Sequence, residues 1–290
     1  MKHRFAVRVG PVGFRIGSDW RAPVAALETL YAGYPAPDVP DFTVRLAAAR
    51  PWRRWVRPAV TVGGDHWLPG TAPLPLAHGL LAAEMGMNLQ VALGCRRFLL
   101  LHAGMAERGG RALVMAGESG SGKSTLAALL GLRGWRFLAD EFALVAPATG
   151  LVHPFPRPAS LKNAGIAAVA AEMPPALNGA RWGPLLAGTP KGDVRHLAAP
   201  ADAVARMDEP AAPALILFPR FGLPPARRPV GAAEAFARLT QASTNYPGLG
   251  EPGFDALNRL VRGALAFAID YPDTGAALAA VEELAAEAGC

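Results

Sequence analysis

The sequence predicts an α/β protein with a β-rich N-terminal portion. Its 290 residues are 51% hydrophobic, which is enough for a sizeable core and argues against bulk disorder. An apolar run, a glycine-rich loop and a helical pattern follow one another over 111–132, in the order of a strand, a turn and a helix. We therefore expect a β-rich N-terminal portion at 1–75 and a larger α/β part at 76–290.

The N-terminal portion shows the patterns of short strands. Apolar and polar residues alternate over 4–17 around a central GPVG, which indicates a β-hairpin. A short helix is expected at 19–31 and a strand at 41–47. Residues 51–75 are rich in Trp, Pro and Gly and contain a second hairpin pattern near 60–67.

The larger part alternates between apolar runs and helical patterns. A turn is expected at 107–110 and another at 147–150, where a strand reverses, whereas 164–210 is rich in Ala and Pro and shows no clear pattern. Strands are expected at 96–104, 111–116, 213–221 and 266–271, and helices at 76–94, 123–132, 231–242, 252–264 and 274–288.

Composition excludes several classes of protein. The net charge is +6, but the arginines are scattered and no nucleic-acid motif with interleaved aromatics occurs, so we expect no nucleic-acid partner. Two cysteines, Cys95 and Cys290, form neither a disulfide framework nor a zinc spacing. The stretch MKHRFAVRVG has no apolar run of the length expected of a signal peptide, and the low-charge stretch 67–83 is too short and proline-broken to span a bilayer. We expect a cytoplasmic protein that does not enter a membrane.

The glycine loop carries the clearest chemistry. Residues 117–125 read GESGSGKST and contain the complete pattern G-x-x-x-x-G-K-[ST]. Glycines let backbone N–H groups turn inward around phosphate, and the following helix adds its positive dipole end. Lys123 would bridge the β- and γ-phosphates, and the Ser124 hydroxyl would bind Mg²⁺. We therefore expect ATP and Mg²⁺, with the nucleotide held by Gly117, Glu118, Ser119, Gly120, Ser121, Gly122, Lys123, Ser124 and Thr125.

Two acids follow the loop at short range. Asp140 and Glu141 come only seventeen and eighteen residues after Lys123, at the end of the strand that is next in the chain. Such a strand end can lie beside the phosphates. One acid would hold Mg²⁺ and the other would accept a proton from an attacking hydroxyl, which makes Ser124, Asp140 and Glu141 the candidate metal set. The alternative is an exposed acidic pair at a strand end.

His102 ends the apolar run before the loop strand. A histidine at that strand tip would lie near the same edge and could hydrogen-bond an acid or a phosphate. A core histidine with satisfied hydrogen bonds is the other interpretation.

Taken together, LLLHAG, GESGSGKST and RGWRFLADE resemble the catalytic domain of HPr kinase/phosphorylase, and more closely the HprK-related kinase A group. The resemblance is clearest over 96–163. It implies a P-loop kinase fold of the HPr kinase/phosphoenolpyruvate carboxykinase type and transfer of the γ-phosphate of ATP to a serine hydroxyl on a protein or peptide. His102, Lys123 and Ser124 match the family pattern. Asp140 matches the candidate general base, and Glu141 replaces the second aspartate.

The resemblance stops at the segment after the acids. Where HPr kinases carry a glycine-rich signature, this chain reads PRPASLKNAG, so the resemblance does not decide HPr recognition or reverse phosphorolysis. Arg157 and Lys162 in this segment are expected to clamp the phosphates or the acceptor, because a cation there stabilises the transition state. Lys191 is expected to be a solvated surface cation.

The sequence thus predicts an ATP- and Mg²⁺-dependent kinase for a serine-type hydroxyl of a peptide or protein. A small-metabolite kinase on the same machinery is the first alternative. A nucleotide-hydrolysing switch, with Glu141 positioning water, is the second, and a sensor without turnover is the third. Some relatives form hexamers, so a homo-oligomer is compatible with the resemblance. The sequence identifies neither the acceptor nor the role of residues 1–75.

Overall fold

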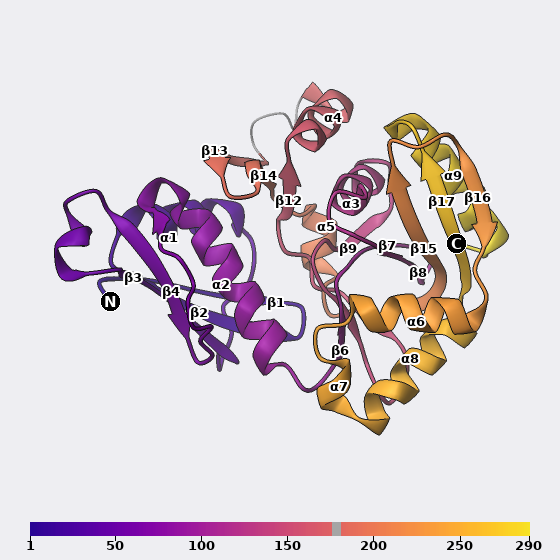
Figure 1. The fold of residues 1–290 in the computed structure, drawn as a ribbon, viewed down its shortest axis with the longest axis horizontal. Helices are drawn as coiled ribbons and strands as arrows, with labels where there is room; N and C mark the ends of the chain where they lie inside the picture. Colours follow the sequence, from indigo (N-terminus) through magenta and orange to yellow (C-terminus); the bar gives the residue numbers. More distant parts are fainter. Residues whose placement is uncertain (176–180) are drawn as a thin grey trace.

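A computed structural model of the chain describes residues 1–175 and 181–290. Two parts lie side by side in it (Figure 1). We call residues 1–94 the N-terminal unit and the remaining described residues the C-terminal unit. Within the described chain, no helix combines the length and apolarity needed to cross a membrane.

The N-terminal unit is a five-stranded sheet in the order β1-β2-β3-β4-β5, covered by two helices. The expected hairpin forms, with its turn at Gly10–Pro11, and β2 and β3 run parallel around α1. The elements are β1 (His3–Val9), β2 (Val12–Ser18), α1 (Arg21–Leu30), β3 (Phe42–Ala48), the 3₁₀ turn Pro51–Arg54, β4 (Ala59–Gly64), β5 (Leu74–Pro75), the 3₁₀ turn Leu76–His78 and α2 (Gly79–Gly94).

Helix α2 packs against β3 and β4 of this sheet. Gly86 makes the close approach possible, because a Cβ there would lie 2.6 Å from a methyl carbon of Val44. The sequence places 76–94 in the larger part of the chain, whereas α2 packs on β3 and β4, so we describe it with the N-terminal unit.

The C-terminal unit is built on a six-stranded sheet in the order β16-β17-β15-β8-β7-β9. Strands β17, β15 and β8 are parallel to one another, and β7 is antiparallel to both of its neighbours. The strands are β7 (Ala103–Arg108), β8 (Arg111–Ala116), β9 (Arg136–Ala139), β15 (Ala212–Phe221), β16 (Ala226–Pro229) and β17 (Leu265–Tyr271).

One edge of this sheet collects the predicted chemistry. Strand β9 runs in the same direction as β8, because both are antiparallel to the β7 strand between them. The C-terminal ends of β8 and β9 therefore share an edge with the N-terminal end of β7, just after His102. Ligands bind outside the carboxyl ends of the strands in such sheets, where the chain changes direction across the sheet.

Helices cover both faces of the sheet, which explains its continuous apolar strands. Leu113 and Met115 of β8 pack in the core beneath α3 and α9, whereas Val114 packs in the core on the opposite face, which also contains residues of α6 and α8. The helices are α3 (Lys123–Leu132), α6 (Ala232–Ala242), the short α7 (Tyr246–Leu249), α8 (Glu251–Gly263) and α9 (Thr274–Glu287).

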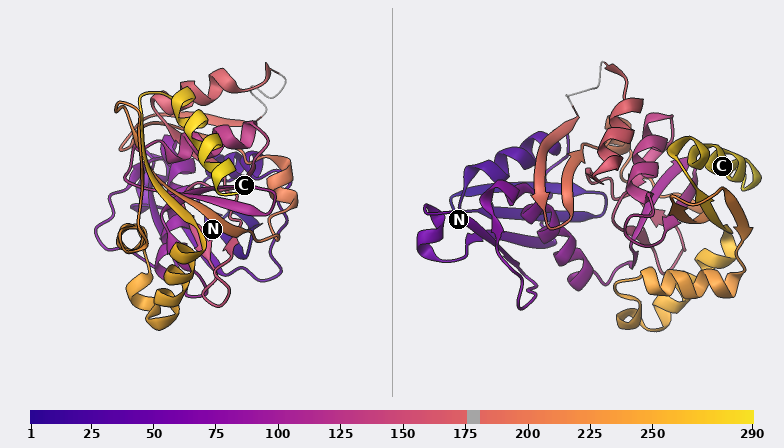
Figure 2. Two further views of the ribbon diagram at one scale, coloured as in Figure 1. Left: turned by 90° about the vertical axis from the view of Figure 1, so that its right-hand side faces the viewer. Right: turned by 45° about the horizontal axis from the view of Figure 1, so that its top comes forward.

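Two smaller sheets complete the C-terminal unit. The β13–β14 hairpin lies beside the N-terminal unit in both Figure 1 and the right-hand view of Figure 2, and β13 contacts α1. One small sheet is β11 (Val152–His153), β10 (Ala143–Val145) and β6 (Leu99–Leu101); the other is β12 (Ala159–Lys162), β14 (Gly192–Leu197) and β13 (Trp182–Thr189), with α4 (Ala164–Glu172) and α5 (Ala201–Ala205) nearby.

The expected single strand at 96–104 is in fact two strands. Strand β6 pairs with β10, and β7 pairs with β8 in the larger sheet, so the chain changes sheet at His102. The backbone N–H of His102 donates to the carbonyl of Ala242 at 2.8 Å rather than to a neighbouring strand. His102 therefore lies between the two strands and takes part in neither of their ladders.

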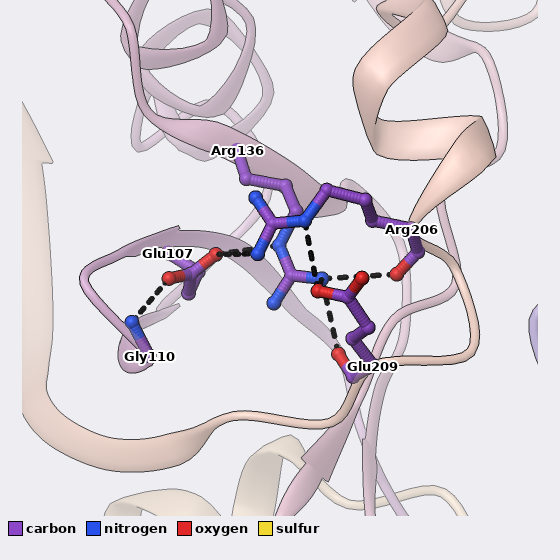
Figure 3. Close-up of polar contacts among 5 residues, drawn as sticks. All are labelled: Glu107, Gly110, Arg136, Arg206 and Glu209. Carbon is purple, nitrogen blue, oxygen red and sulfur yellow. Dashed lines mark hydrogen bonds and ion pairs between the residues drawn. The ribbon is translucent and has the colours of Figure 1, made fainter.

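A buried ion pair fixes the far ends of β7 and β9 (Figure 3). Arg136 Nε donates to Glu107 Oε2 at 2.5 Å, and both side chains are 3% exposed. Glu107 also accepts from the N–H of Gly110, and Arg136 donates to the carbonyls of Arg206 and Glu209. Because every member has several partners, this cluster fixes the ends of β7 and β9 that lie away from the carboxyl edge of the sheet.

Candidate functional site

A cavity of about 430 Å³ opens at the carboxyl edge of the six-stranded sheet. The glycine loop and the start of α3 form one wall, and Asp140 and Glu141 at the end of β9 form another. His102 and Lys162 also line it. Residues separated by up to sixty positions in the chain, as the sequence analysis expected of this edge, therefore face one space.

The glycine loop is shaped by backbone conformations that favour glycine. Gly120 and Gly122 have φ values of 87° and 93°. A Cβ on Gly122 would lie 2.3 Å from the hydroxyl of Tyr271, which itself donates to the carbonyl of Ser121 at 2.6 Å. Tyr271 at the end of β17 thus holds the loop against the sheet, a role with no local signal in the sequence.

Lys123 begins helix α3 and is 5% exposed. Its ammonium donates to the carbonyls of Gly117 and Glu118 at 2.7 and 2.8 Å, across the loop that it follows. Burial lowers the pKa of Lys123 from its usual value, and the nearby carboxylates of Asp140 and Glu141 partly oppose that shift. The site therefore brings a cation and the positive end of α3 to the same point.

Asp140 is the most perturbed acid of the site. Its carboxyl group is 3% exposed, and Oδ2 accepts from the N–H of Ser160 at 2.7 Å, while Oδ1 is buried without a partner among the described residues. Burial is the main cause that raises the pKa of Asp140 to about 6, and the Glu141 carboxylate adds to it; the Ser124 side chain and the Ser160 amide act in the opposite direction. A carboxyl with that pKa can exchange a proton near neutral pH.

His102 and Glu141 face each other beside Asp140. His102 Nδ1 lies 3.5 Å from Glu141 Oε2, and the imidazole is about half exposed. Burial lowers the pKa of His102, although Glu141 favours its charged form. At neutral pH the imidazole is therefore mostly neutral, and it is placed to act on Glu141 rather than directly on Asp140.

Two lysines reach the cavity from the segment opposite the loop. Lys162 ends β12, and Lys191 lies in the turn of the β13–β14 hairpin. Asn163 joins the two, because its backbone N–H donates to the carbonyl of Asp193 and its side-chain oxygen accepts from the N–H of Asp193. Lys191 is exposed, as expected of a surface cation, but it also lines the cavity, because the β12–β14 pairing joins positions thirty residues apart.

Arg157 is not brought to the glycine loop. Its guanidinium is buried and pairs with Glu84, and it also donates to the side chains of Asn88 and Tyr31. Burial disfavours the charge of Arg157, but Tyr31 and Glu84 together raise its pKa above the usual value. Of the two cations expected to clamp phosphate, Lys162 lines the cavity, whereas Arg157 occupies a junction between the two units.

The residues fit a magnesium ion in part. Ser124 and Asp140 face the same space, and the partnerless Oδ1 of Asp140 offers a hard oxygen of the kind that Mg²⁺ prefers. Within residues 1–175 and 181–290, no group of three or more His, Cys, Asp or Glu side chains is arranged to hold a metal alone. A magnesium ion would therefore share its ligands between the chain and phosphate oxygens, as is usual for this ion.

Comparison with known proteins gives only distant likeness. No family model matches the chain, and no curated protein matches it. Among solved structures, the chain is similar to the Hpr(Ser) kinase/phosphatase from Coxiella burnetii, with 14% identity over 65% of this chain and 98% of that chain. The TM-score is 0.26, so the likeness carries no argument, and the site is interpreted from its own residues.

Proposed function

We propose that the chain is an ATP- and Mg²⁺-dependent kinase that transfers the γ-phosphate to a serine-type hydroxyl of a peptide or protein. The motifs that resemble HPr kinase, and the cavity that residues of these motifs line, support this proposal. The acceptor class rests on the resemblance, and the chemistry rests on the cavity.

The chain's own residues divide the work of binding. The loop amides and the α3 N-terminus surround the β-phosphate, and Lys123 neutralises charge between the β- and γ-phosphates. Phe221 and Ala277, which line the same cavity, supply apolar surface for the nucleoside. Lys162 and Lys191 lie on the side away from the loop, where they would attract the γ-phosphate and the charge that develops on it.

Asp140 would act as the general base. Its raised pKa leaves it ionised at neutral pH and able to take the proton from an acceptor hydroxyl as the oxygen attacks phosphorus. The magnesium ion, held by Ser124 with Asp140 or Glu141, would neutralise negative charge on the phosphates. His102 would orient Glu141 through the contact between Nδ1 and Oε2.

The observation that carries the proposal is the position of Asp140 opposite the loop. A buried carboxyl beside Ser124, with one oxygen fixed by Ser160 and the other without a partner, costs stability unless it serves a ligand. A switch that only hydrolyses ATP needs a group that orients water, whereas a transferase needs a base of this kind.

The proposal is tested by ATP turnover with Mg²⁺ in the presence of size-fractionated cell extract. The wild-type chain should turn over slowly alone and faster with one fraction. Asp140→Asn should still bind ATP and should lose at least about a hundredfold in stimulated rate, the usual scale for general-base loss. Lys123→Met should lose ATP binding itself.

Steady hydrolysis that is indifferent to every fraction would contradict the kinase and favour a nucleotide switch. Stimulation by a low-mass fraction alone would favour a metabolite kinase on the same site. Tight ATP binding with neither hydrolysis nor transfer would favour a sensor.

A further inference from the structure

A buried polar cluster joins the N-terminal unit to the segment that holds Asp140. We call Tyr31, Glu84, Asn88 and Arg157 the junction cluster. Tyr31 follows α1, Glu84 and Asn88 lie on α2, and Arg157 lies in the C-terminal unit between β11 and β12. The Arg157 and Glu84 side chains are only 5% and 6% exposed. This cluster is the most deeply buried charged contact between the two units among the described residues.

Arg157 is held from several directions. It donates to the carboxylate and to the backbone carbonyl of Glu84, to Asn88 Oδ1 and to the hydroxyl of Tyr31. The Tyr31 hydroxyl in turn donates to Glu84 at 2.9 Å. Because the N–H donors of the guanidinium are bonded to groups on fixed elements, the side chain has a single position. The backbone at residue 157 is therefore fixed relative to α2.

The neighbouring backbone is fixed as well. The hydroxyl of Tyr34, also from the N-terminal unit, donates to the carbonyl of Pro156, and the N–H of Phe155 donates to the carbonyl of Leu138 at 2.7 Å. The segment 155–157 is therefore attached to α1 and α2 on one side and to β9 on the other.

The same segment reaches the site three residues later. The N–H of Ser160 donates to Asp140 Oδ2 at 2.7 Å, and Lys162 lines the cavity beyond it. A small cavity of about 20 Å³ is lined by Glu84, Arg157 and Asp140 together, so the junction cluster and the acid pair are direct neighbours.

We propose that Arg157 is a positioning residue: through its contacts with Glu84 and Tyr31 it seats 155–162 on the N-terminal unit and thereby sets the Ser160–Asp140 hydrogen bond. The N-terminal unit then serves as a rigid support of the catalytic carboxylate. The kinetic part of this inference rests on the proposed function; the structural part does not.

The test separates positioning from simple stability. Removing one member of a buried ion pair leaves the other charge buried and unpaired. The single variants Arg157→Met and Glu84→Leu should therefore unfold readily. The double variant Arg157→Met with Glu84→Leu removes both charges and keeps apolar volume, which is often tolerated by the fold. The conservative variant Arg157→Lys keeps the charge but loses the forked contact.

The matched control is the other buried ion pair, Arg136 with Glu107. It is buried to a similar degree, but it lies at the start of β9, about 13 Å of extended chain from Asp140 by the rise per residue of a strand. The double variant Arg136→Met with Glu107→Leu should change the melting temperature by a similar amount. It should leave the Ser160 amide and kcat close to wild type.

Two readouts are compared in every variant. Hydrogen exchange of the Ser160 amide should rise at least tenfold in the Arg157/Glu84 double variant, because the segment that carries this amide moves away from its acceptor, Asp140 Oδ2. In transfer assays, kcat should fall about tenfold to a hundredfold while the Kd for ATP is unchanged, as expected for a misplaced base. In Arg157→Lys, the exchange rate of the Ser160 amide and kcat should both lie between those of the wild type and those of the double variant.

Unchanged exchange at Ser160 in the folded double variant would overturn the inference, as would equal losses of kcat in the control. If the wild-type chain transfers no phosphate, the proposed function fails, and the exchange measurement alone still decides whether Arg157 positions the segment.

Discussion

At the scale of single residues, burial of the Asp140 carboxylate in the site lowers the stability of the folded protein. Asp140 is buried next to Glu141, and its hydrogen bond from the neutral Ser160 amide does not cancel the cost of burying its charge. The raised pKa means that the folded chain holds a proton on Asp140 more tightly than the unfolded chain does.

The sign of the pH effect follows from that shift. The unfolded value is 3.8 and the folded value is about 6, so stability from this group falls as the pH rises through that interval. Above about pH 7 this contribution to the free energy of unfolding is lost completely. At 1.36 kcal/mol for each unit of pKa shift, the loss is on the order of 3 kcal/mol.

Asp140→Asn should therefore stabilise the protein at neutral and alkaline pH. The amide oxygen can still accept from Ser160, and the buried charge is gone. We expect thermal denaturation to show a higher Tm for the variant at pH 8 and a difference that shrinks toward pH 4. A Tm difference that is constant across this range, or a less stable variant at pH 8, would show that the burial of Asp140 is not costly.

At the scale of elements, the glycine loop depends on β17, because Tyr271 at the end of that strand holds the loop in place. Gly120 and Gly122 share the same backbone region, but only Gly122 faces the Tyr271 hydroxyl. Gly122→Ala should therefore combine backbone strain with a steric clash, whereas Gly120→Ala introduces strain alone, on the order of 1–2 kcal/mol.

We expect Gly122→Ala to weaken ATP binding much more than Gly120→Ala, measured by calorimetric titration. Adding Tyr271→Phe should restore part of the affinity of Gly122→Ala by removing the clashing oxygen. Equal losses in the two alanine variants, with no recovery in Tyr271→Phe, would mean that Tyr271 does not hold the loop.

The elements with strong local patterns were predictable from sequence. Strand β8 and helix α3 have the expected bounds of 111–116 and 123–132, because an apolar run, a glycine loop and a helical pattern fix them locally. The split of 96–104 at His102 was missed, since an unbroken apolar run does not reveal that the chain changes sheet there.

The candidate site was predictable only where it is local in sequence. The loop and the acid pair line one cavity, as their spacing suggested. Arg157 and Lys191 depend on partners far away in the chain, Glu84 for the first and the β12–β14 pairing for the second. A single sequence carries no signal for such contacts, so neither the burial of Arg157 at the junction nor the position of Lys191 at the cavity could be predicted.

At the scale of the whole molecule, the two units share one core. Phe14 of the N-terminal unit lies 6.3 Å from Phe155 between ring centroids, and buried residues of both units belong to the same apolar cluster. Gly10 approaches the C-terminal unit so closely that a Cβ would lie 2.0 Å from the carbonyl oxygen of Pro154. The units are therefore expected to unfold together.

Deleting residues 1–94 should leave an insoluble or molten C-terminal unit. The deletion uncovers Phe155 and removes the Glu84 carboxylate that pairs with Arg157. The measurement is solubility and near-UV circular dichroism of the truncated chain. The exposed ion pair between Arg8 and Asp208 offers the control, since replacing both by alanine should change the unfolding free energy by less than about 1 kcal/mol. A soluble, folded truncated chain that binds ATP but transfers no phosphate would instead make the N-terminal unit the acceptor-binding part.

The central claim, that the cavity performs phosphoryl transfer, is tested most directly by following the γ-phosphate of radiolabelled ATP. The wild-type chain is incubated with Mg²⁺ and fractionated extract, and the label is separated into inorganic phosphate, small molecules and protein or peptide. The account predicts label on a serine of a peptide or protein, lost in Asp140→Asn. Label that appears only as inorganic phosphate, at the same rate with and without extract, would contradict it.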